Sequence, residues 1–410
     1  MLGISPSQFR WPLTLREGDV VSPFPAFPLR FPYFFPSAGV SPMSKSESTN
    51  HERTRSQWLG HHPAVVVGLA VLVAGGAYLG VRWLDSETGG NPNILGLRSA
   101  PAGVGPGRAP RRPISAVIDE LENVTIPRDQ ILDGGPGKDG IPSISKPQFV
   151  SAAEADFLQP DSRVIGIETG AKPRCYPLAI LNYHECVNDE IGGVPIAVTY
   201  CPLCDSSLVF DRRVGERTVE FGISGLLYNS NVLLYDRGAD ELESLWSQMK
   251  SEAVSGDASS AELATIPFEM TTWSDWQSRH PETEVLSTET GFTRDYSHNP
   301  YAGYFAEGDF YFPADQLPTG GTPGMRDRIL GVWVDDSSRA YPVKEFSSVD
   351  EPVTIDEELS GKTFRIRYEP EHQTLRVLDR DDGVNHAYSL WFAWYAFRPE
   401  TEVFEYTPAD

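Results

Sequence analysis

Apolar positions along this chain fall into short runs that either alternate with polar positions or continue for a few residues before a turn-forming residue. IAVTY (196–200) and SLVFDR (207–212) flank the motif Cys-Pro-Leu-Cys, while FRIRY (364–368) and LRVLDR (375–380) flank Glu-Pro-Glu-His. Short β-type runs with tight connections are typical of antiparallel hairpins. The pattern therefore predicts a mainly β fold with a few short helices.

A helical pattern interrupts the strands in TTWSDWQSRH (271–280), where Trp273, Trp276 and His280 recur at helical spacing. Pro281 follows at once, and because proline cannot continue a helix, we expect this short helix to end there. Three more strand-type runs precede it along the chain: TVEFGIS (218–224), NVLLYDR (231–237) and SLWSQ (244–248).

Two blocks of the sequence recur. Residues 164–181 align without gaps with residues 329–346, and residues 187–212 align with residues 355–380. The offset changes by only three residues between the blocks, and chance explains two such matches poorly. The sequence therefore predicts an internal duplication that gives two related β units.

The first β unit is expected to span residues 114–320, with a helical insert, and a second, degenerate unit residues 321–410. Residues that both copies share, such as the Tyr-Pro and Asp-Arg pairs, are expected to be structural. Function is therefore sought where the copies differ. The first copy carries His184, Cys201 and Cys204, and the second has Val349, Glu369 and His372 at the corresponding places.

An uncharged apolar segment lies near the N-terminus. AVVVGLAVLVAGGAYLGV (64–81) is at the lower edge of the length that crosses a bilayer as a helix. We expect a single transmembrane or signal-anchor helix over residues 63–84, with the remainder exported from the cytoplasm. Ala-Gly-Gly-Ala at 74–77 leaves cleavage of a signal open, while the full length favours a retained anchor in the cell membrane.

The segments around this helix differ in composition. Residues 1–42 are expected to be a non-native or disordered extension, because proline at this density prevents both helix and sheet. Residues 43–62 form a polar N-terminal arm, and residues 85–113, rich in Gly, Pro, Ala and Arg, form a flexible tether.

The chain is strongly acidic. Its 57 acidic and 34 basic residues give a net charge of −23, which argues against nucleic acid as a partner. Only 7 of the basic residues are lysines, and few lysines with a large acidic excess favour a halophilic source. The hydrophobic fraction of 40% is enough for a sizeable core and excludes global disorder.

All four cysteines lie between positions 175 and 204, which indicates one local site rather than a disulfide scaffold. Cys201 and Cys204, at C-x-x-C spacing, can form a disulfide, share a metal, or act as attacking and resolving thiols. Strands are expected on both sides of the motif, so no helix N-terminus lowers the pKa of either thiol. A structural disulfide at the tip of a hairpin is the alternative.

A metal site needs further ligands. His184 is the nearest candidate, followed by Glu185, Cys175 and Cys186. With His184 the two cysteines make a Cys2His set that suits copper or zinc. A histidine in this position is more often a hydrogen-bonded structural residue, and the two remaining cysteines also fit as small buried hydrophobic side chains.

Several of these segments together resemble the domain-of-unknown-function 3179 family, over about residues 115 to 406. The motifs that carry the resemblance are YPLAILNYHECVND, VTYCPLCDSSLVFDR, FGISGLLYNSNVLLYDR, SLWSQ, TTWSDWQSRHPETEVLS and WFAWYAFRPETEVF. Some members of that family are selenoproteins with selenocysteine at the place of Cys204. The resemblance therefore implies redox or soft-metal chemistry at Cys204, and it places Cys175 and Cys186 outside the family pattern.

The leading hypothesis is a membrane-anchored, exported protein whose Cys201/Cys204 pair is redox-active or binds a metal with the help of His184. The alternative is a non-catalytic cell-envelope module in which the same cysteines form a structural disulfide. A third hypothesis is a ligand-binding module that uses residues 224–231 and tyrosines such as Tyr301 and Tyr304, which fit a pocket wall as well as a core.

Overall fold

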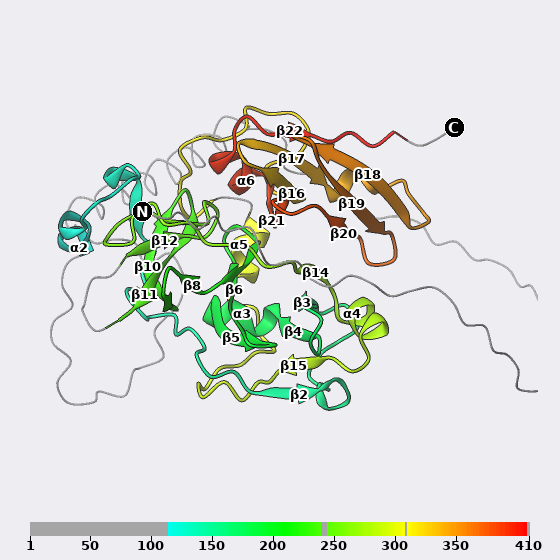
Figure 1. Cartoon of the computed structure of the whole chain (residues 1–410), viewed down its shortest axis with the longest axis horizontal. Helices are drawn as coiled ribbons and strands as arrows, with labels where there is room; N and C mark the ends of the chain where they lie inside the picture. The colour runs from blue at the N-terminus through cyan, green and yellow to red at the C-terminus, as the bar shows by residue number, and fades with distance from the viewer. Residues whose placement is uncertain (1–113, 239–243, 308–309, 408–410) are drawn as a thin grey trace, which may run out of the picture. The chain divides into compact units, whose positions relative to one another are not determined.

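The computed structural model describes residues 114–238, 244–307 and 310–407 (Figure 1). The predicted extension, polar arm, membrane helix and tether all fall within residues 1–113 and so lie outside the described residues. Among the helices that are described, none is long and apolar enough to cross a membrane.

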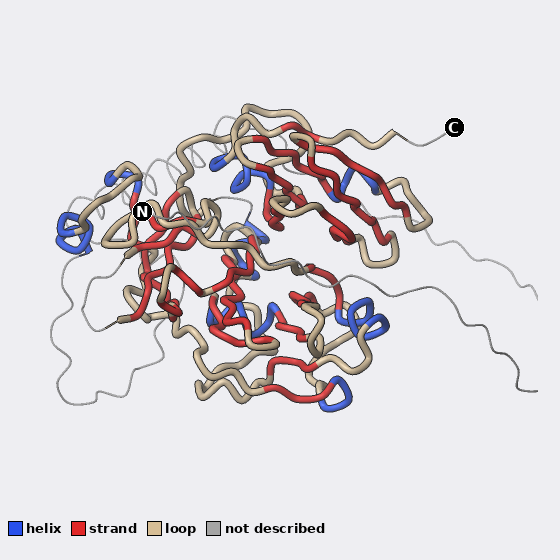
Figure 2. The backbone as a smooth tube through the Cα atoms, viewed as in Figure 1, coloured by secondary structure: helices blue, strands red, loops and turns tan. Residues whose placement is uncertain are grey.

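Strands dominate the described part of the chain, as the sequence predicts, and the helices are short (Figure 2). The predicted helix before Pro281 is confirmed, and it begins where the Thr272 hydroxyl accepts a hydrogen bond from the Asp275 amide (3.4 Å). The α-helices of the described residues are α2 (Ile114–Glu120), α3 (Leu178–His184), α4 (Trp273–Arg279), α5 (Ala302–Glu307) and α6 (Trp391–Phe397).

One seven-stranded sheet holds the cysteine motif and combines strands from both predicted β units. The two groups of strands meet where Tyr388 of β21 pairs with Ser207 of β7. In spatial order the sheet consists of β22 (Glu402–Val403), β17 (Ser337–Pro342), β16 (Arg328–Val334), β21 (Asn385–Leu390), β7 (Ser206–Asp211), β6 (Val194–Cys201) and β5 (Cys186–Ile191).

The remaining strands form four smaller sheets. A five-stranded sheet has the order β14 (Glu269–Thr272), β3 (Arg163–Ile167), β4 (Arg174–Pro177), β15 (Glu284–Leu286) and β2 (Phe149–Ser151). Another has the order β1 (Ile131–Asp133), β10 (Glu220–Tyr228), β11 (Asn231–Arg237), β12 (Leu245–Ser247) and β13 (Glu252–Ala253). The last two are β18 (Val353–Leu359), β19 (Lys362–Glu369) and β20 (Thr374–Arg380), and the pair β8 (Arg213–Val214) and β9 (Arg217–Thr218).

The two predicted β units have the same order of elements. The first runs β3, β4, α3, β5, β6 and β7, and the second runs β16, β17, the short 3-10 helix η3 (Val343–Phe346), β18, β19 and β20. A later strand, helix and strand complete each unit in the same way. Strand β14 pairs antiparallel with β3 and β15 parallel with β4, while β21 pairs antiparallel with β16 and β22 parallel with β17.

A tryptophan lies against a glycine in each unit. A Cβ atom on Gly166 would lie 2.3 Å from the ring of Trp276, and a Cβ atom on Gly331 would lie 2.3 Å from the ring of Trp394. Each indole nitrogen donates a hydrogen bond to the hydroxyl of a threonine seven residues later, at 3.0 and 3.1 Å. Only glycine lets the ring of α4 or α6 approach the strand this closely.

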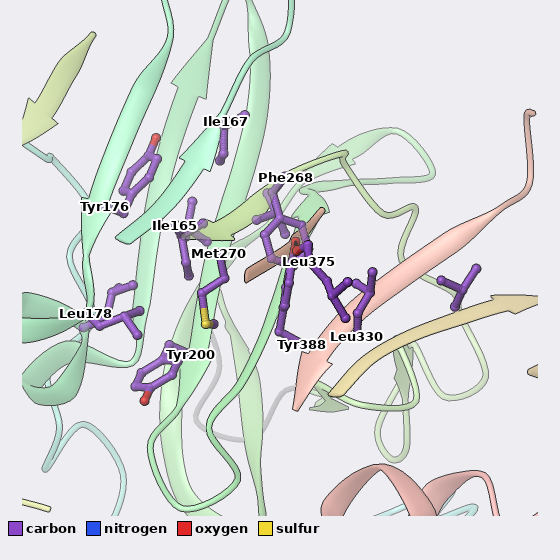
Figure 3. Packing of buried hydrophobic residues seen from close by; sticks show 14 of the residues in the cluster. Ile165, Ile167, Tyr176, Leu178, Tyr200, Phe268, Met270, Leu330, Leu375 and Tyr388 are labelled. Atoms are coloured by element: carbon purple, nitrogen blue, oxygen red, sulfur yellow. Dashed lines mark hydrogen bonds between the residues drawn. The ribbon is translucent and has the colours of Figure 1, made fainter. Parts of the chain in front are cut away.

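The apolar residues form separate clusters, and the cysteine motif belongs to one of them. Figure 3 shows part of another, in which Ile165, Met270 and Tyr388 come together from strands far apart in the sequence. Cys201 and Cys204 lie in the cluster that also contains Trp246 and Trp394. The motif is therefore part of the folded core and not an exposed hairpin tip.

Candidate thiol site

The predicted hairpin around Cys-Pro-Leu-Cys is confirmed. Strand β6 ends at Cys201, β7 begins at Ser206, and the two strands pair antiparallel up to the Cys201–Ser206 pair. The Cys204 amide donates to the Cys201 carbonyl oxygen (3.2 Å), which closes the turn. Asp205 leaves the turn with φ +47°, in the left-handed region where aspartate is one of the better tolerated side chains.

Asp205 ties this turn to two other strands. Its carboxylate, only 2% exposed, accepts hydrogen bonds from Arg163 of β3 (2.8 Å), Arg328 of β16 (3.0 Å) and the Tyr200 hydroxyl (2.9 Å). Burial by itself raises the pKa of Asp205, because it disfavours the charged carboxylate. The guanidinium groups of Arg163 and Arg328 together have a larger, opposite effect and keep this pKa below its usual value. The turn that carries the thiols is therefore held by an ion cluster.

Both thiols point at one backbone oxygen. Cys204 Sγ lies 3.2 Å and Cys201 Sγ 3.9 Å from the carbonyl oxygen of Ser230. Ser230 sits in the two-residue turn between β10 and β11, where Asn229 (φ +51°) and Ser230 (φ +63°) are both left-handed. Two such residues are typical of a tight β-hairpin. All four cysteines of the chain are free thiols in the structure.

The Cys204 thiol is held in its neutral form. Cys201 is 1% and Cys204 0% exposed. Burial raises the pKa of the Cys204 thiol well above its usual value, and the neighbouring Cys201 raises it further, while a hydrogen bond from Asn231 works in the opposite direction. Because the thiolate is the reactive form, chemistry at Cys204 needs a base close by.

A buried carboxyl group lies at the end of helix α3. Glu185 ends helix α3 with φ +55° and is 6% exposed, and its Oε1 accepts a hydrogen bond from the Tyr301 hydroxyl (3.2 Å). Burial raises the pKa of Glu185 to about 8, and the bond from Tyr301 works the other way. The negative charge of Glu185 in turn contributes to the raised pKa of Cys204.

Two tyrosines cover the motif. Tyr301 precedes α5 and is 8% exposed, and Tyr304 lies within α5 and is 1% exposed. The Tyr304 hydroxyl donates to the carbonyl oxygen of Leu203, at the centre of the motif (2.9 Å). Both tyrosines also interact electrostatically with Cys201. The cover therefore comes from a segment about a hundred residues along the chain from the cysteines.

A buried polar network lies on the far side of the turn. Ser206 donates to Gln248 Oε1 (2.7 Å), Asn231 donates to the same oxygen (2.9 Å), and Gln248 Nε2 donates to the Thr199 hydroxyl (2.9 Å). Ser230 Oγ and Asn231 Oδ1 are buried and have no hydrogen-bond partner among the described residues.

His184 makes no hydrogen bond to either thiol. Its Nδ1 donates to the Pro142 carbonyl oxygen (2.7 Å), so that the neutral ring accepts from the Tyr296 hydroxyl at Nε2 (2.7 Å). Both ring nitrogens are therefore occupied, and the expected help of His184 to the cysteines is not seen in the structure. These two bonds fit the hydrogen-bonded structural role that the sequence left as the alternative.

The structure does not assemble the expected Cys2His set. Within the described residues, no group of three or more histidine, cysteine, aspartate or glutamate side chains lies close enough together to hold a metal ion. Cys175 and Cys186 are both fully buried, and Cys175 packs in a different apolar cluster, beside Trp276. The four cysteines therefore do not gather at one point.

A large open cleft, of about 1460 Å³, is lined by neither sulfur. Asp205 lines one wall, and the turn 369–373 of the second β unit lines another. Many of its charged groups pair with each other, as Arg376 does with Glu369 (3.0 Å). Because these positive and negative side chains neutralise one another, the cleft favours neither an anionic nor a cationic ligand.

Comparison with known proteins gives a family but no activity. A family model described as "Protein of unknown function (DUF3179)" matches residues 138–401. No curated protein and no solved structure matches the chain.

Proposed function

We propose a function from the site itself, because the chain belongs to the DUF3179 family, whose description names no activity. In this proposal Cys201 and Cys204 form a buried dithiol that is reversibly oxidised to a disulfide. The exchange partner is a small-molecule disulfide, because reaching sulfurs with 1% or less exposure requires the site to open, and a small molecule needs a smaller opening than a protein partner. The convergence of both sulfurs on the Ser230 carbonyl oxygen is the observation that carries the proposal.

The reaction is a thiol–disulfide exchange in two steps. One cysteine thiol loses its proton, and its sulfur attacks the small disulfide, whose S–S bond breaks and releases a small thiol that takes up a proton. The other cysteine thiol then attacks the mixed disulfide in the same way. The Cys201–Cys204 bond forms and a second small thiol leaves, so the protein loses two hydrogen atoms and the small disulfide gains them.

The second β unit argues against a purely structural disulfide. Its turn closes with the same bond, from the His372 amide to the Glu369 carbonyl oxygen (3.3 Å), as the first turn does from Cys204 to Cys201 (3.2 Å). This hairpin forms without any cysteine. A disulfide is therefore not needed to shape such a turn, which favours a chemical role for the two thiols.

The shared order of elements supports the internal duplication, which we include in the proposal. Two turns with one backbone pattern and different side chains fit a duplicated unit in which only one copy carries the cysteines. The turn shared by the two units supplies the scaffold, and Cys201 and Cys204 supply the chemistry.

We also propose that the uncharged segment 64–81 anchors the protein in the cell membrane and that the remainder lies outside the cytoplasm. A disulfide between Cys201 and Cys204 persists more readily outside the reducing cytosol. Protease added to intact cells is expected to degrade the part from about residue 115 onward. Complete protection before lysis would contradict this location.

A thiol count tests the redox proposal. The purified protein is incubated with bis(2-hydroxyethyl) disulfide, alkylated in denaturant and weighed by mass spectrometry. We expect two of the four thiols to be lost without any adduct, and Cys201→Ser/Cys204→Ser to lose none. The matched control, Cys175→Ser/Cys186→Ser, keeps the response. Four alkylated thiols in every sample of the unaltered protein would refute the proposal.

A further inference from the structure

We propose that the small disulfide reaches the Cys201/Cys204 dithiol from the large cleft, through a local opening between the two β units. The ion pair of Asp205 with Arg328 is the latch that keeps this opening closed. The inference rests on the proposed redox function and adds the route by which a reagent enters the same site. The rest of the core, including Cys175, stays folded while the site is open.

The dithiol needs an opening before it can react. Cys201 is 1% and Cys204 0% exposed, and neither sulfur lines the cleft. Exchange nevertheless requires that a sulfur of the small disulfide comes into contact with a cysteine sulfur. The residues that separate the cleft from the motif must therefore move.

The wall between the cleft and the thiols includes direct neighbours of the motif. Asp205 lines the cleft and directly follows Cys204 in the chain. Leu390 of β21 also lines the cleft, and its amide donates to the Cys204 carbonyl oxygen (2.8 Å). Leu390 packs in the same apolar cluster as both cysteines. Moving Leu390 away from the turn would therefore expose the motif on the side of the cleft.

The two β units are joined by little backbone pairing at this wall. Strands β7 and β21, both fully described, pair at Ser207 and Tyr388 alone. By contrast, β21 pairs with β16 along its whole length, and β6 pairs with β7 from Ile196 to Cys201. Because few backbone hydrogen bonds have to break between β7 and β21, we expect the large sheet to separate there first.

Contacts at the other end of β21 keep the units together and fit a hinge. His386 Nε2 donates to the Phe268 carbonyl oxygen (2.8 Å), and the two rings are stacked. Asn385 Oδ1 accepts a hydrogen bond from the Thr265 hydroxyl (2.6 Å). These contacts lie at the start of β21, whereas Leu390 is its last residue. An opening can therefore be confined to the end beside the cysteines.

The Asp205 carboxylate ties the two units together at the opening. Arg163 of the first unit donates to its Oδ1 (2.8 Å), and Arg328 of the second unit donates to its Oδ2 (3.0 Å). The side chain of Arg328 is 56% exposed, against 28% for Arg163. When the units separate, Arg328 can turn into the water of the cleft while Asp205 keeps Arg163. The opening therefore costs less than leaving a buried charge without any partner.

The test measures access separately from redox chemistry. The reduced full-length protein is alkylated with iodoacetamide in native buffer, and peptide mass spectrometry follows each cysteine over time. In the unaltered protein we expect Cys201 or Cys204 to be alkylated faster than Cys175, which is fully buried in another cluster and reports unfolding of the whole fold. Arg328→Gln should speed alkylation of the motif about 10-fold, because a charge-assisted hydrogen bond no longer holds the site closed.

Two control variants separate the latch from other effects. Lys344→Gln removes a charge that lines the same cleft and is 69% exposed, and it should leave the rate at the motif unchanged. Gly166→Ala destabilises the fold away from the latch, so it should speed alkylation of Cys175 and not of the motif. Equal rates for Cys175 and the motif in the unaltered protein, or an unchanged rate at the motif in Arg328→Gln, would overturn the proposal.

Deuterium exchange of the unaltered protein gives a second measurement that needs neither a variant nor a thiol. We expect the Leu390 amide, which bonds to Cys204, to exchange faster than the amides that join β6 to β7. Equal protection of these amides would overturn the local opening. A motif that is readily alkylated but never oxidised by bis(2-hydroxyethyl) disulfide would instead refute the redox function, while the opening would stand.

Discussion

Cys204 Sγ lies 3.2 Å from the carbonyl oxygen of Ser230, a contact that joins the hairpin of β6 and β7 to the hairpin of β10 and β11. The two residues belong to different sheets, and each is at the turn of its own hairpin. The thiols are therefore enclosed between two tight turns, and the surrounding residues are arranged to hold them there.

Among the cysteines, we predict that only the pair of the motif matters for redox behaviour. Cys204→Ser should abolish the formation of the intramolecular disulfide. Cys175→Ser and Cys186→Ser should each lower the free energy of unfolding by about 1 kcal/mol, as small changes at buried sites do. Urea denaturation and the thiol count together measure both effects. A redox response lost in Cys175→Ser but kept in Cys204→Ser would reverse the assignment.

The contacts between glycine and tryptophan predict two equivalent weak points. Gly166→Ala and Gly331→Ala place a methyl group 2.3 Å from an indole ring, and each should lower the free energy of unfolding by about 1–3 kcal/mol or more. Gly324→Ala is the control, because a Cβ there meets its nearest neighbour at 3.4 Å. Urea denaturation in which all three variants match the unaltered protein would show that the rings move aside freely.

The raised pKa of Glu185 predicts how stability depends on pH. The folded protein keeps the proton of Glu185 up to about pH 8, whereas the unfolded chain loses it near the ordinary glutamate pKa of 4.5. Between these values the folded state binds more protons, so the contribution of Glu185 to stability is complete below pH 4.5 and falls as the pH rises. The slope approaches about 1.4 kcal/mol per pH unit.

Glu185→Gln cannot titrate and should therefore gain stability relative to the unaltered protein from pH 5 to pH 8. Urea denaturation at several pH values measures the difference between the two free energies of unfolding. A difference that stays constant over this range would mean that Glu185 ionises in the folded protein as it does in water.

The cluster around Asp205 predicts a large effect of one substitution. Asp205→Asn removes the charge that Arg163 and Arg328 share, and breaking a buried ion pair typically lowers the free energy of unfolding by about 3–5 kcal/mol. Asp379→Asn is the control, because Asp379 is 70% exposed and its pair with Arg365 is worth about 1 kcal/mol or less. Similar midpoints of urea denaturation for both variants would contradict the structural role of Asp205.

The hairpins and α4 could be predicted because their signals are local. Short apolar runs beside tight turns define β6, β7, β19 and β20, and Pro281 marks the end of the helix. The repeated blocks of sequence likewise pointed to the matching order of elements. The segments before residue 114 lie outside the described residues, so the membrane helix stays a prediction.

The surroundings of the thiols could not be predicted in the same way, because they come from distant parts of the chain. Ser230 is 26 residues from Cys204, and Tyr304 is 101 residues from Leu203. Residues that are adjacent in the sequence also have different surroundings here. His184 ends α3 and bonds to Pro142, whereas the next residue, Glu185, has a left-handed φ and accepts a hydrogen bond from Tyr301.

The redox equilibrium of the Cys201/Cys204 pair tests the central claim most directly. The protein is equilibrated with graded ratios of reduced and oxidised dithiothreitol, quenched with acid, alkylated and weighed by mass spectrometry. The proposal predicts one transition in which the number of alkylated thiols falls from four to two, with the new disulfide mapped to Cys201 and Cys204. Four alkylated thiols at every ratio, or a disulfide mapped to another pair, would contradict it.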